Sequence, residues 1–205
     1  MTTTLFGLGR SRLRKRLLVY YFSNTEAVHH LREIASILGE DPGNLSKELA
    51  RLCAEAVFHA SVKGRQKYFS LNTANPFFPD LRSIIAKTVG IEARLGDEVK
   101  RDEAVLIAFI YGSCAGKGLS PVSDVDVMLI TKDDGFDDNE FLKLSADLKK
   151  ETGREIDFTH FPKREWIARS AKRDSFIISV IKGPRIMLKG DEKDLRRLTA
   201  ARDAH

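Results

Sequence analysis

Two aspartates separated by one residue, Asp124 and Asp126, are the side chains in this sequence best suited to chemistry. They stand at the start of an apolar run, Val125 to Ile130, that is typical of a β-strand. Alternate residues of a strand point to the same face, so the two carboxylates should lie about 6.6 Å apart along that face. Carboxylates held this close repel each other unless a cation lies between them. The pair therefore predicts a site for a hard divalent cation such as Mg²⁺, which binds carboxylates together with substrate phosphates.

A glycine–serine pair, Gly112 and Ser113, follows a second apolar run, Ala104 to Tyr111. Glycine lets the backbone approach a phosphate closely, and the serine hydroxyl adds a hydrogen-bond donor. A short helix should begin here, with backbone N–H groups available to an anion. We predict that Gly112 and Ser113 bind the phosphates of a nucleoside triphosphate. Lys117, in the same loop, either adds a phosphate contact or is simply solvated.

A third carboxylate, Asp157, lies in the segment Arg154 to Phe161. It is flanked by Ile156 and Phe158, as the alternation of a half-buried strand requires. A strand here would bring Asp157 to the same site. The alternative is an acidic strand edge without any function.

The spacing of these motifs, Gly-Ser followed by ten residues and then Asp-x-Asp, resembles the signature of the polymerase-beta-like nucleotidyltransferase superfamily, especially its minimal nucleotidyltransferases. The resemblance implies a two-metal Mg²⁺ site in which Asp124 and Asp126 hold the metal on the triphosphate, with ATP the expected nucleotide. It implies that Asp157 completes the second metal site and helps to deprotonate an acceptor hydroxyl, which makes all three aspartates catalytic. Many minimal members carry arginines at the positions of Cys114 and Gly116, and this sequence has neither.

The order of elements expected in the first half of the chain is that of a winged helix-turn-helix. The expected elements are helices at 12–22, 28–38 and 45–57, then strands at 58–62 and 67–71 around a turn at 63–66. Further elements are a linker at 72–79, helices at 78–89, 91–100, 140–152 and within 163–182, strands at 104–111, 125–130 and 155–161, and a possible strand at 185–188. We thus predict an α/β (α+β) protein in which a mixed sheet with flanking helices follows the winged helix. The predicted domains are a winged helix-turn-helix at 1–75, connecting helices at 76–103, the nucleotidyltransferase domain at 104–192 and a C-terminal tail at 193–205.

Positive charge is concentrated in the first half of the chain. Residues 1–90 carry a net charge of +6, whereas residues 91–205 carry −1. This distribution is expected if the first half meets a polyanion such as DNA. The whole chain resembles a prokaryotic family in which a winged helix is fused to a nucleotidyltransferase domain, and its N-terminal part is similar to arsenic-repressor-like transcription regulators. That resemblance implies binding to DNA as a homodimer.

The residues expected to contact DNA lie on the third helix and on the hairpin. The helix should enter the major groove, and the hairpin should meet the backbone or the minor groove. The expected contacts are Asn44, Ser46, Lys47 and Arg51 on the helix and Lys63, Arg65 and Lys67 on the hairpin. A basic cluster from Arg10 to Arg16 either binds phosphates or solvates the first helix. The alternative for all of these residues is an exposed basic face without a partner.

These features predict a DNA-binding transcriptional regulator whose C-terminal domain binds a nucleoside triphosphate and transfers a nucleotidyl group to a hydroxyl acceptor. One alternative is an antitoxin that modifies a partner toxin protein, and another is a degenerate domain that binds a nucleotide without catalysis. No apolar run approaches the ~20 residues of a membrane-spanning helix, and residues 1–16 lack a signal-peptide pattern, so we expect a cytoplasmic protein. Cys53 and Cys114 show no metal-ligand spacing and no disulfide framework.

Overall fold

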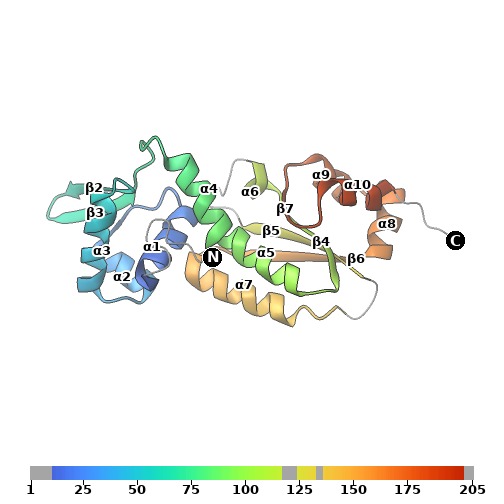
Figure 1. The fold of residues 1–205 in the computed structure, drawn as a ribbon, viewed down its shortest axis with the longest axis horizontal. Helices are drawn as coiled ribbons and strands as arrows, with labels where there is room; N and C mark the ends of the chain where they lie inside the picture. The colour runs from blue at the N-terminus through green and yellow to red at the C-terminus, as the bar shows by residue number, and fades with distance from the viewer. Residues whose placement is uncertain (1–10, 117–123, 133–135, 201–205) are drawn as a thin grey trace. The chain divides into compact units, whose positions relative to one another are not determined.

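A computed structural model describes residues 11–116, 124–132 and 136–200 of the 205-residue chain. The chain forms two compact units, residues 1–91 and residues 92–205. Figure 1 shows the elements of each unit. Among the helices that these residues form, none combines the length and the apolar character needed to cross a membrane.

The first unit packs helices against a three-stranded antiparallel sheet with the strand order β1-β3-β2. Its elements are α1 (Arg12–Ser23), β1 (His29–His30), α2 (Leu31–Leu38), α3 (Pro42–Ala54), β2 (Phe58–Lys63), β3 (Gln66–Leu71) and α4 (Phe78–Thr88). The predicted order of three helices followed by a hairpin is confirmed. At the hairpin turn, Lys63 pairs with Gln66, and Gly64 has the positive φ of 61° that a tight turn demands.

Two helix boundaries in the first unit differ from those predicted. Helix α2 begins at Leu31 rather than at Val28, because His29 and His30 pair with β3 and the His30 side chain caps the helix by accepting from the Glu33 N–H. Helix α3 begins at Pro42 rather than at Leu45, because the Asp41 carboxylate accepts a hydrogen bond from the Asn44 N–H. Residues 42–44, which the prediction left outside the helix, are therefore its first turn.

The second unit is built on a four-stranded mixed sheet with the order β6-β5-β4-β7. Only β5 and β6 run parallel; the other two pairs are antiparallel. The elements are α5 (Ile91–Arg101), β4 (Val105–Tyr111), α6 (Ser113–Gly116), β5 (Val125–Thr131), α7 (Asn139–Thr152), β6 (Ile156–Pro162), α8 (Lys163–Ala171), α9 (Ser175–Lys182), β7 (Ile186–Lys189) and α10 (Glu192–Ala200). The predicted mixed sheet with flanking helices is confirmed.

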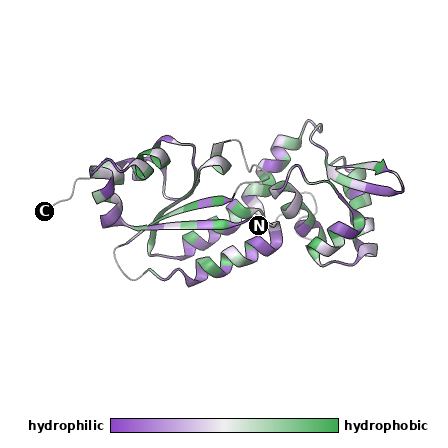
Figure 2. Ribbon diagram, turned by 180° about the vertical axis from the view of Figure 1, so that it is seen from behind, coloured by the Kyte–Doolittle hydropathy of each residue, from purple (hydrophilic) through white to green (hydrophobic). Residues whose placement is uncertain are grey.

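Helices cover both faces of this sheet. Helix α7 connects the parallel strands β5 and β6, and it carries both hydrophobic and hydrophilic residues along its length (Figure 2), as a helix with one face on a sheet should. On this side, Phe141 of α7 contacts Phe158 of β6. The opposite face forms a core with α8, α9 and α10, in which Phe109 and Trp166 are fully buried.

Residues 193–200, predicted to be part of a tail, belong to helix α10. The Asp191 carboxylate accepts a hydrogen bond from the Asp194 N–H at the start of this helix. Leu195 is 1% exposed in the core that α10 shares with α8. Residues 193–200 are mostly charged, and their few apolar residues do not form a pattern that predicts a helix.

Candidate active site

The three aspartates come together at one end of the second sheet. Asp126 of β5 pairs in register with Asp157 of the parallel strand β6. On its other side Asp126 pairs with Tyr111, the last residue of β4. Tyr111, Asp126 and Asp157 therefore form a row across three neighbouring strands. Adjacent strands lie about 4.8 Å apart, so the two carboxylates of this row are close neighbours.

Asp124 extends this group along β5. It immediately precedes the strand, two residues before Asp126, and it is exposed. The backbone N–H of Val125 donates to the carbonyl of Glu155 on the β6 side. The start of β5 is thus tied to the segment that leads to Asp157.

The charge distribution makes the centre of the group unfavourable for an isolated carboxylate. The pKa of Asp126 is raised by partial burial, and further by repulsion from Asp157 and from Asp124. Both neighbours are exposed, whereas Asp126 is half-buried between them. A cation placed against these oxygens would relieve the repulsion.

The donor set fits a hard divalent cation, because it consists of carboxylate oxygens alone. Within the part of the chain that the structure describes, no three His, Cys, Asp or Glu side chains are already arranged to hold one metal ion. The carboxylates that could hold a cation at this end of the sheet are those of Asp124, Asp126 and Asp157.

The Gly-Ser turn lies directly against Asp126. Gly112 has a φ of 76°, a conformation that favours glycine. A Cβ atom added to Gly112 would lie 2.7 Å from Oδ2 of Asp126, which is closer than van der Waals contact allows. Ser113 follows as the first residue of α6 and is exposed. The turn and the carboxylate group therefore border the same space.

The remaining loop positions have different environments. Lys117 lies outside the residues that the structure describes. Cys114 is fully buried, and its Sγ–H donates to the backbone carbonyl of Asp124 at 3.0 Å. The side chain at this position therefore points into the protein and fastens α6 to the start of β5.

Sequence reasoning gave no role to Arg154, which is 4% exposed just before β6. Its Nη2 donates to Sγ of Cys114 at 3.3 Å. Burial lowers the pKa of Arg154, and its interactions with Cys114 and Asp124 oppose that effect. Nothing in the local sequence marks an arginine flanked by a glycine and a glutamate as an interior residue.

Sequence reasoning also gave no role to Tyr111. Its hydroxyl is hydrogen-bonded to Oγ1 of Thr159 at 3.1 Å, so its side chain crosses β5 to reach β6 beside the carboxylates. Burial raises the pKa of Tyr111, and Asp126 and Asp157 raise it further. The neutral hydroxyl is thus favoured. Phe176 of α9 packs edge-on against the Tyr111 ring, with 6.1 Å between the centroids.

In the first unit, the residues expected to contact DNA are all exposed. On α3, the opposite face buries Leu45, Leu49 and Leu52. Lys63 and Lys67 on the hairpin lie over the rings of Tyr68 and Phe69, at 5.7 Å and 5.5 Å from the ring centroids.

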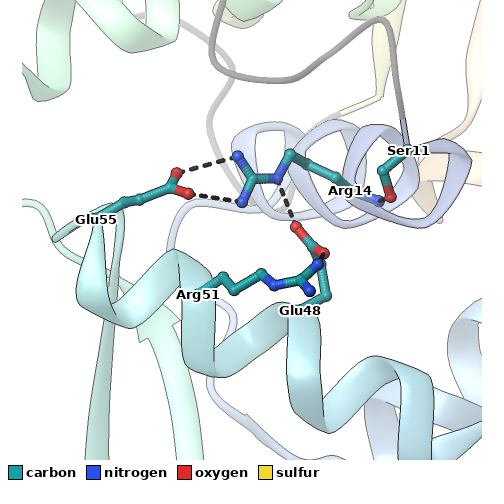
Figure 3. Close-up of polar contacts among 5 residues, drawn as sticks. All are labelled: Ser11, Arg14, Glu48, Arg51 and Glu55. Carbon is teal, nitrogen blue, oxygen red and sulfur yellow. Dashed lines mark hydrogen bonds and ion pairs between the residues drawn. The ribbon is translucent and has the colours of Figure 1, made fainter.

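The basic cluster at the start of α1 is partly used inside the protein. The Arg14 side chain is 10% exposed and forms ion pairs with Glu48 and Glu55 of the α3 region (Figure 3). Arg51, whose side chain is 70% exposed, lies 3.3 Å from Glu48. Arg16 pairs with Glu40. Arg14 and Arg16 therefore join α1 to neighbouring segments of the first unit, a role that the sequence did not predict for the basic cluster.

Two solved structures are similar to part of this chain. One is the crystal structure of a mutant of the toxin–antitoxin MntA-HpeT, with 15% sequence identity and a TM-score of 0.37 over 53% of this chain and 80% of that chain. The other is a crystal structure of a toxin–antitoxin with AMP-PNP, with 17% identity and a TM-score of 0.37 over 53% of this chain and 81% of that chain. No curated protein matches the sequence.

Residues 94–179 match the profile of the family described as "Polymerase beta, Nucleotidyltransferase". This range includes the Gly-Ser turn and all three aspartates of the carboxylate group. Over residues 94–179 the second unit of this chain is therefore similar to nucleotidyltransferase domains of the polymerase-beta kind.

Proposed function

We propose that the second unit transfers a nucleotidyl group from a nucleoside triphosphate, with ATP the expected donor, to a hydroxyl acceptor in the presence of Mg²⁺. The observation that carries this proposal is the row formed by Asp126 and Asp157 with the Gly112 turn packed against it. It brings a carboxylate group and the Gly-Ser turn to the borders of one space.

Each residue has a defined part in this reaction. Gly112 and Ser113 receive the β- and γ-phosphates, because Gly112 has no Cβ atom and Ser113 presents an exposed hydroxyl. Lys117 is a further candidate for a phosphate contact. Asp124, Asp126 and Asp157 would hold two Mg²⁺ ions, which supply charge stabilisation for the attacking and leaving oxygens.

The transfer step balances without any other reagent. The acceptor oxygen forms a bond to the α-phosphorus while the bond from that phosphorus to the pyrophosphate oxygen breaks. The proton of the acceptor hydroxyl leaves toward Asp157, which is exposed on the outer strand β6. Pyrophosphate departs along the Gly-Ser turn.

A labelling experiment tests the proposal. The full chain is incubated with Mg²⁺ and ATP labelled either at the α- or at the γ-phosphate, together with cell-derived RNA or protein as acceptor. Transfer of the α-label alone, lost in Asp124→Asn and Asp157→Asn, is the expected result. The matched control is Asp147→Asn, which neutralises an exposed aspartate on α7. Equal transfer by Asp124→Asn and by the unaltered protein would reject the assignment of the site.

The class of acceptor is read from the same experiment. Label on a protein supports the antitoxin version, in which a partner toxin is modified, and label on RNA rejects it. Binding of Mg²⁺-ATP without transfer to any acceptor identifies a degenerate domain that retains only its nucleotide site.

The first unit supports a second function, which is sequence-specific DNA binding by a winged helix that regulates transcription. The favouring observation is that α3 presents Asn44, Ser46 and Lys47 on its exposed face, while the hairpin exposes three further basic residues. The net charge of +6 in residues 1–90 agrees with a polyanionic partner. Binding as a homodimer would require two half-sites in the DNA.

The DNA-binding proposal is tested with the DNA upstream of the gene over a range of salt concentrations. Affinity should fall steeply with salt, and Lys47→Ala combined with Arg65→Ala should weaken it by about tenfold or more. Lys143→Ala, an exposed lysine of the second unit, serves as the control. If the unaltered protein retains no DNA even at low salt, the regulator function is rejected.

A further inference from the structure

Arg154 is a buried cation placed behind the proposed phosphate-binding turn. Only 4% of the residue is exposed, although an arginine is among the residues that proteins seldom bury. Burying a charge is costly unless the surroundings compensate for it. The position of Arg154 therefore calls for a reason beyond packing.

Among the described residues, Arg154 reaches the site through Cys114. Its Nη2 donates to Sγ of Cys114 at 3.3 Å, and the Cys114 Sγ–H donates to the carbonyl of Asp124 at 3.0 Å. Cys114 is the second residue of α6, directly after Ser113. Two hydrogen bonds thus connect the base of β6, the Gly-Ser turn and the first metal-binding aspartate.

The other side of Arg154 is fixed to helix α7. Its backbone N–H donates to Oγ1 of Thr152, and that hydroxyl in turn donates to the carbonyl of Leu148. Thr152 and Leu148 are both fully buried. The guanidinium therefore extends from a rigid base rather than from a free loop.

The charge of Arg154 also reaches Asp124 directly. The interaction between the two is among the causes that favour the charged guanidinium despite its burial. The described part of the loop, Ser113 to Gly116, contains no basic residue. Arg154 thus provides a positive charge behind the turn, where an incoming triphosphate would add several negative charges.

We propose that Arg154 is a positioning residue that acts through Cys114 to hold the Gly-Ser turn and Asp124 in place for the triphosphate. The inference rests on the proposed nucleotidyltransferase function, since it names how that site obtains affinity for its substrate. The guanidinium acts through its contact with Cys114 and is not a catalytic residue. It sets the position of the turn and makes the local field more favourable for the phosphates and for Asp124.

The experiment compares four variants of the full chain. Arg154→Met keeps an unbranched apolar stem and removes the charged guanidinium, whereas Arg154→Lys keeps the charge. Cys114→Ala removes the sulfur between Arg154 and Asp124 and leaves the arginine itself. The matched control is Arg94→Met, which removes a partly buried guanidinium paired with Glu151 between α5 and α7.

Three readouts are taken for each variant. Affinity for Mg²⁺-ATP and for Mg²⁺-tripolyphosphate is measured by calorimetry, because tripolyphosphate carries the phosphates without base or sugar. KM and kcat for transfer are measured separately. The fluorescence of Trp166, the single tryptophan of the chain, reports that the second unit remains folded, since this side chain is fully buried there.

Arg154→Met should weaken both ligands by roughly tenfold and raise KM more than it lowers kcat, because charge-assisted hydrogen bonds fix the turn. Arg154→Lys should recover most of this affinity, Cys114→Ala should show a smaller loss in the same direction, and Arg94→Met should bind normally. Unchanged affinity in both Arg154→Met and Cys114→Ala overturns the inference alone. Failure of the unaltered protein to bind Mg²⁺-ATP overturns the proposed function and the inference together. A loss that Arg94→Met shares equally also overturns the inference, because it marks a general effect of destabilisation.

Discussion

Gly112 lies so close to Asp126 that a Cβ atom on the glycine would come within 2.7 Å of a carboxylate oxygen. The turn also holds Gly112 at a φ of 76°, so two separate constraints favour glycine here. The space beside Asp126 therefore depends on the absence of a side chain at residue 112.

Gly112→Ala should cost about 1–2 kcal/mol through the positive φ, and it should also displace the Asp126 carboxylate. We expect loss of Mg²⁺-ATP binding, measured by calorimetry. Gly39→Ala is the control for backbone strain alone, because Gly39 has a φ of 60° and no heavy atom within 4 Å of its added Cβ. If both variants bind the nucleotide as the unaltered protein does, the closeness of Gly112 to Asp126 does not matter for nucleotide binding.

Asp126→Asn should stabilise the metal-free protein at neutral pH while abolishing transfer. The pKa of Asp126 is raised in the folded protein by burial and by its two aspartate neighbours. The folded state therefore keeps a proton that the unfolded chain has released, so the free energy of unfolding falls as pH rises from about 4, the value for a free aspartate, through the raised pKa. This loss of folding stability is still present at pH 7.

The measurement is thermal unfolding in EDTA at several pH values. The advantage of Asp126→Asn should be present at pH 7 and shrink toward pH 3, where the carboxylate of the unaltered protein is protonated. Mg²⁺ should raise the melting temperature of the unaltered protein more than that of the variant. If Asp126→Asn melts at a lower temperature than the unaltered protein at pH 7 in EDTA, the repulsion assigned to Asp126 is wrong.

Tyr111→Phe should destabilise the second unit by about 1 kcal/mol, because it removes the hydrogen bond to Thr159 beside the carboxylates. Urea unfolding measures this cost, followed by Trp166 fluorescence for the second unit and by far-UV circular dichroism for the first unit, which contains the control residue. Tyr68→Phe is the control, since the Tyr68 hydroxyl bonds Gln66 in an exposed position and should contribute little. Equal effects of the two substitutions would show that burial of the Tyr111–Thr159 hydrogen bond adds nothing to its contribution to the free energy of unfolding.

Arg14→Met should destabilise the first unit by about 3 kcal/mol or more, because Glu48, with a side chain 7% exposed, loses its buried partner. Far-UV circular dichroism should show an earlier urea transition, whereas Trp166 fluorescence, which reports the second unit, should change little. Arg101→Met is the comparison, since the Arg101 side chain is 74% exposed in its pair with Glu98 and should matter by less than about 1 kcal/mol. If the urea transition of Arg14→Met is unchanged in both signals, the ion pairs of Figure 3 do not contribute to the stability of the first unit.

The sequence by itself determined the elements whose pattern is local. Apolar runs marked β4 and β5, the alternation around Asp157 marked β6, and the glycines at 39 and 64 marked a helix end and a turn, because backbone conformation and side-chain period act over a few residues. Motif spacing also identified the three aspartates and the Gly-Ser turn as one group, which the pairing of Asp126 with Asp157 places together.

Tertiary structure decided what depends on residues distant in the chain. The strand β1 exists because β3 offers a pairing edge to His29 and His30, and α10 exists because Leu195 finds a core. Arg14 and Arg154 look like surface residues in the sequence, yet each is buried where partners from other segments compensate its charge. Whether a charged side chain turns inward is settled by the carboxylates, sulfur and carbonyls around it, and only the folded chain brings those groups together.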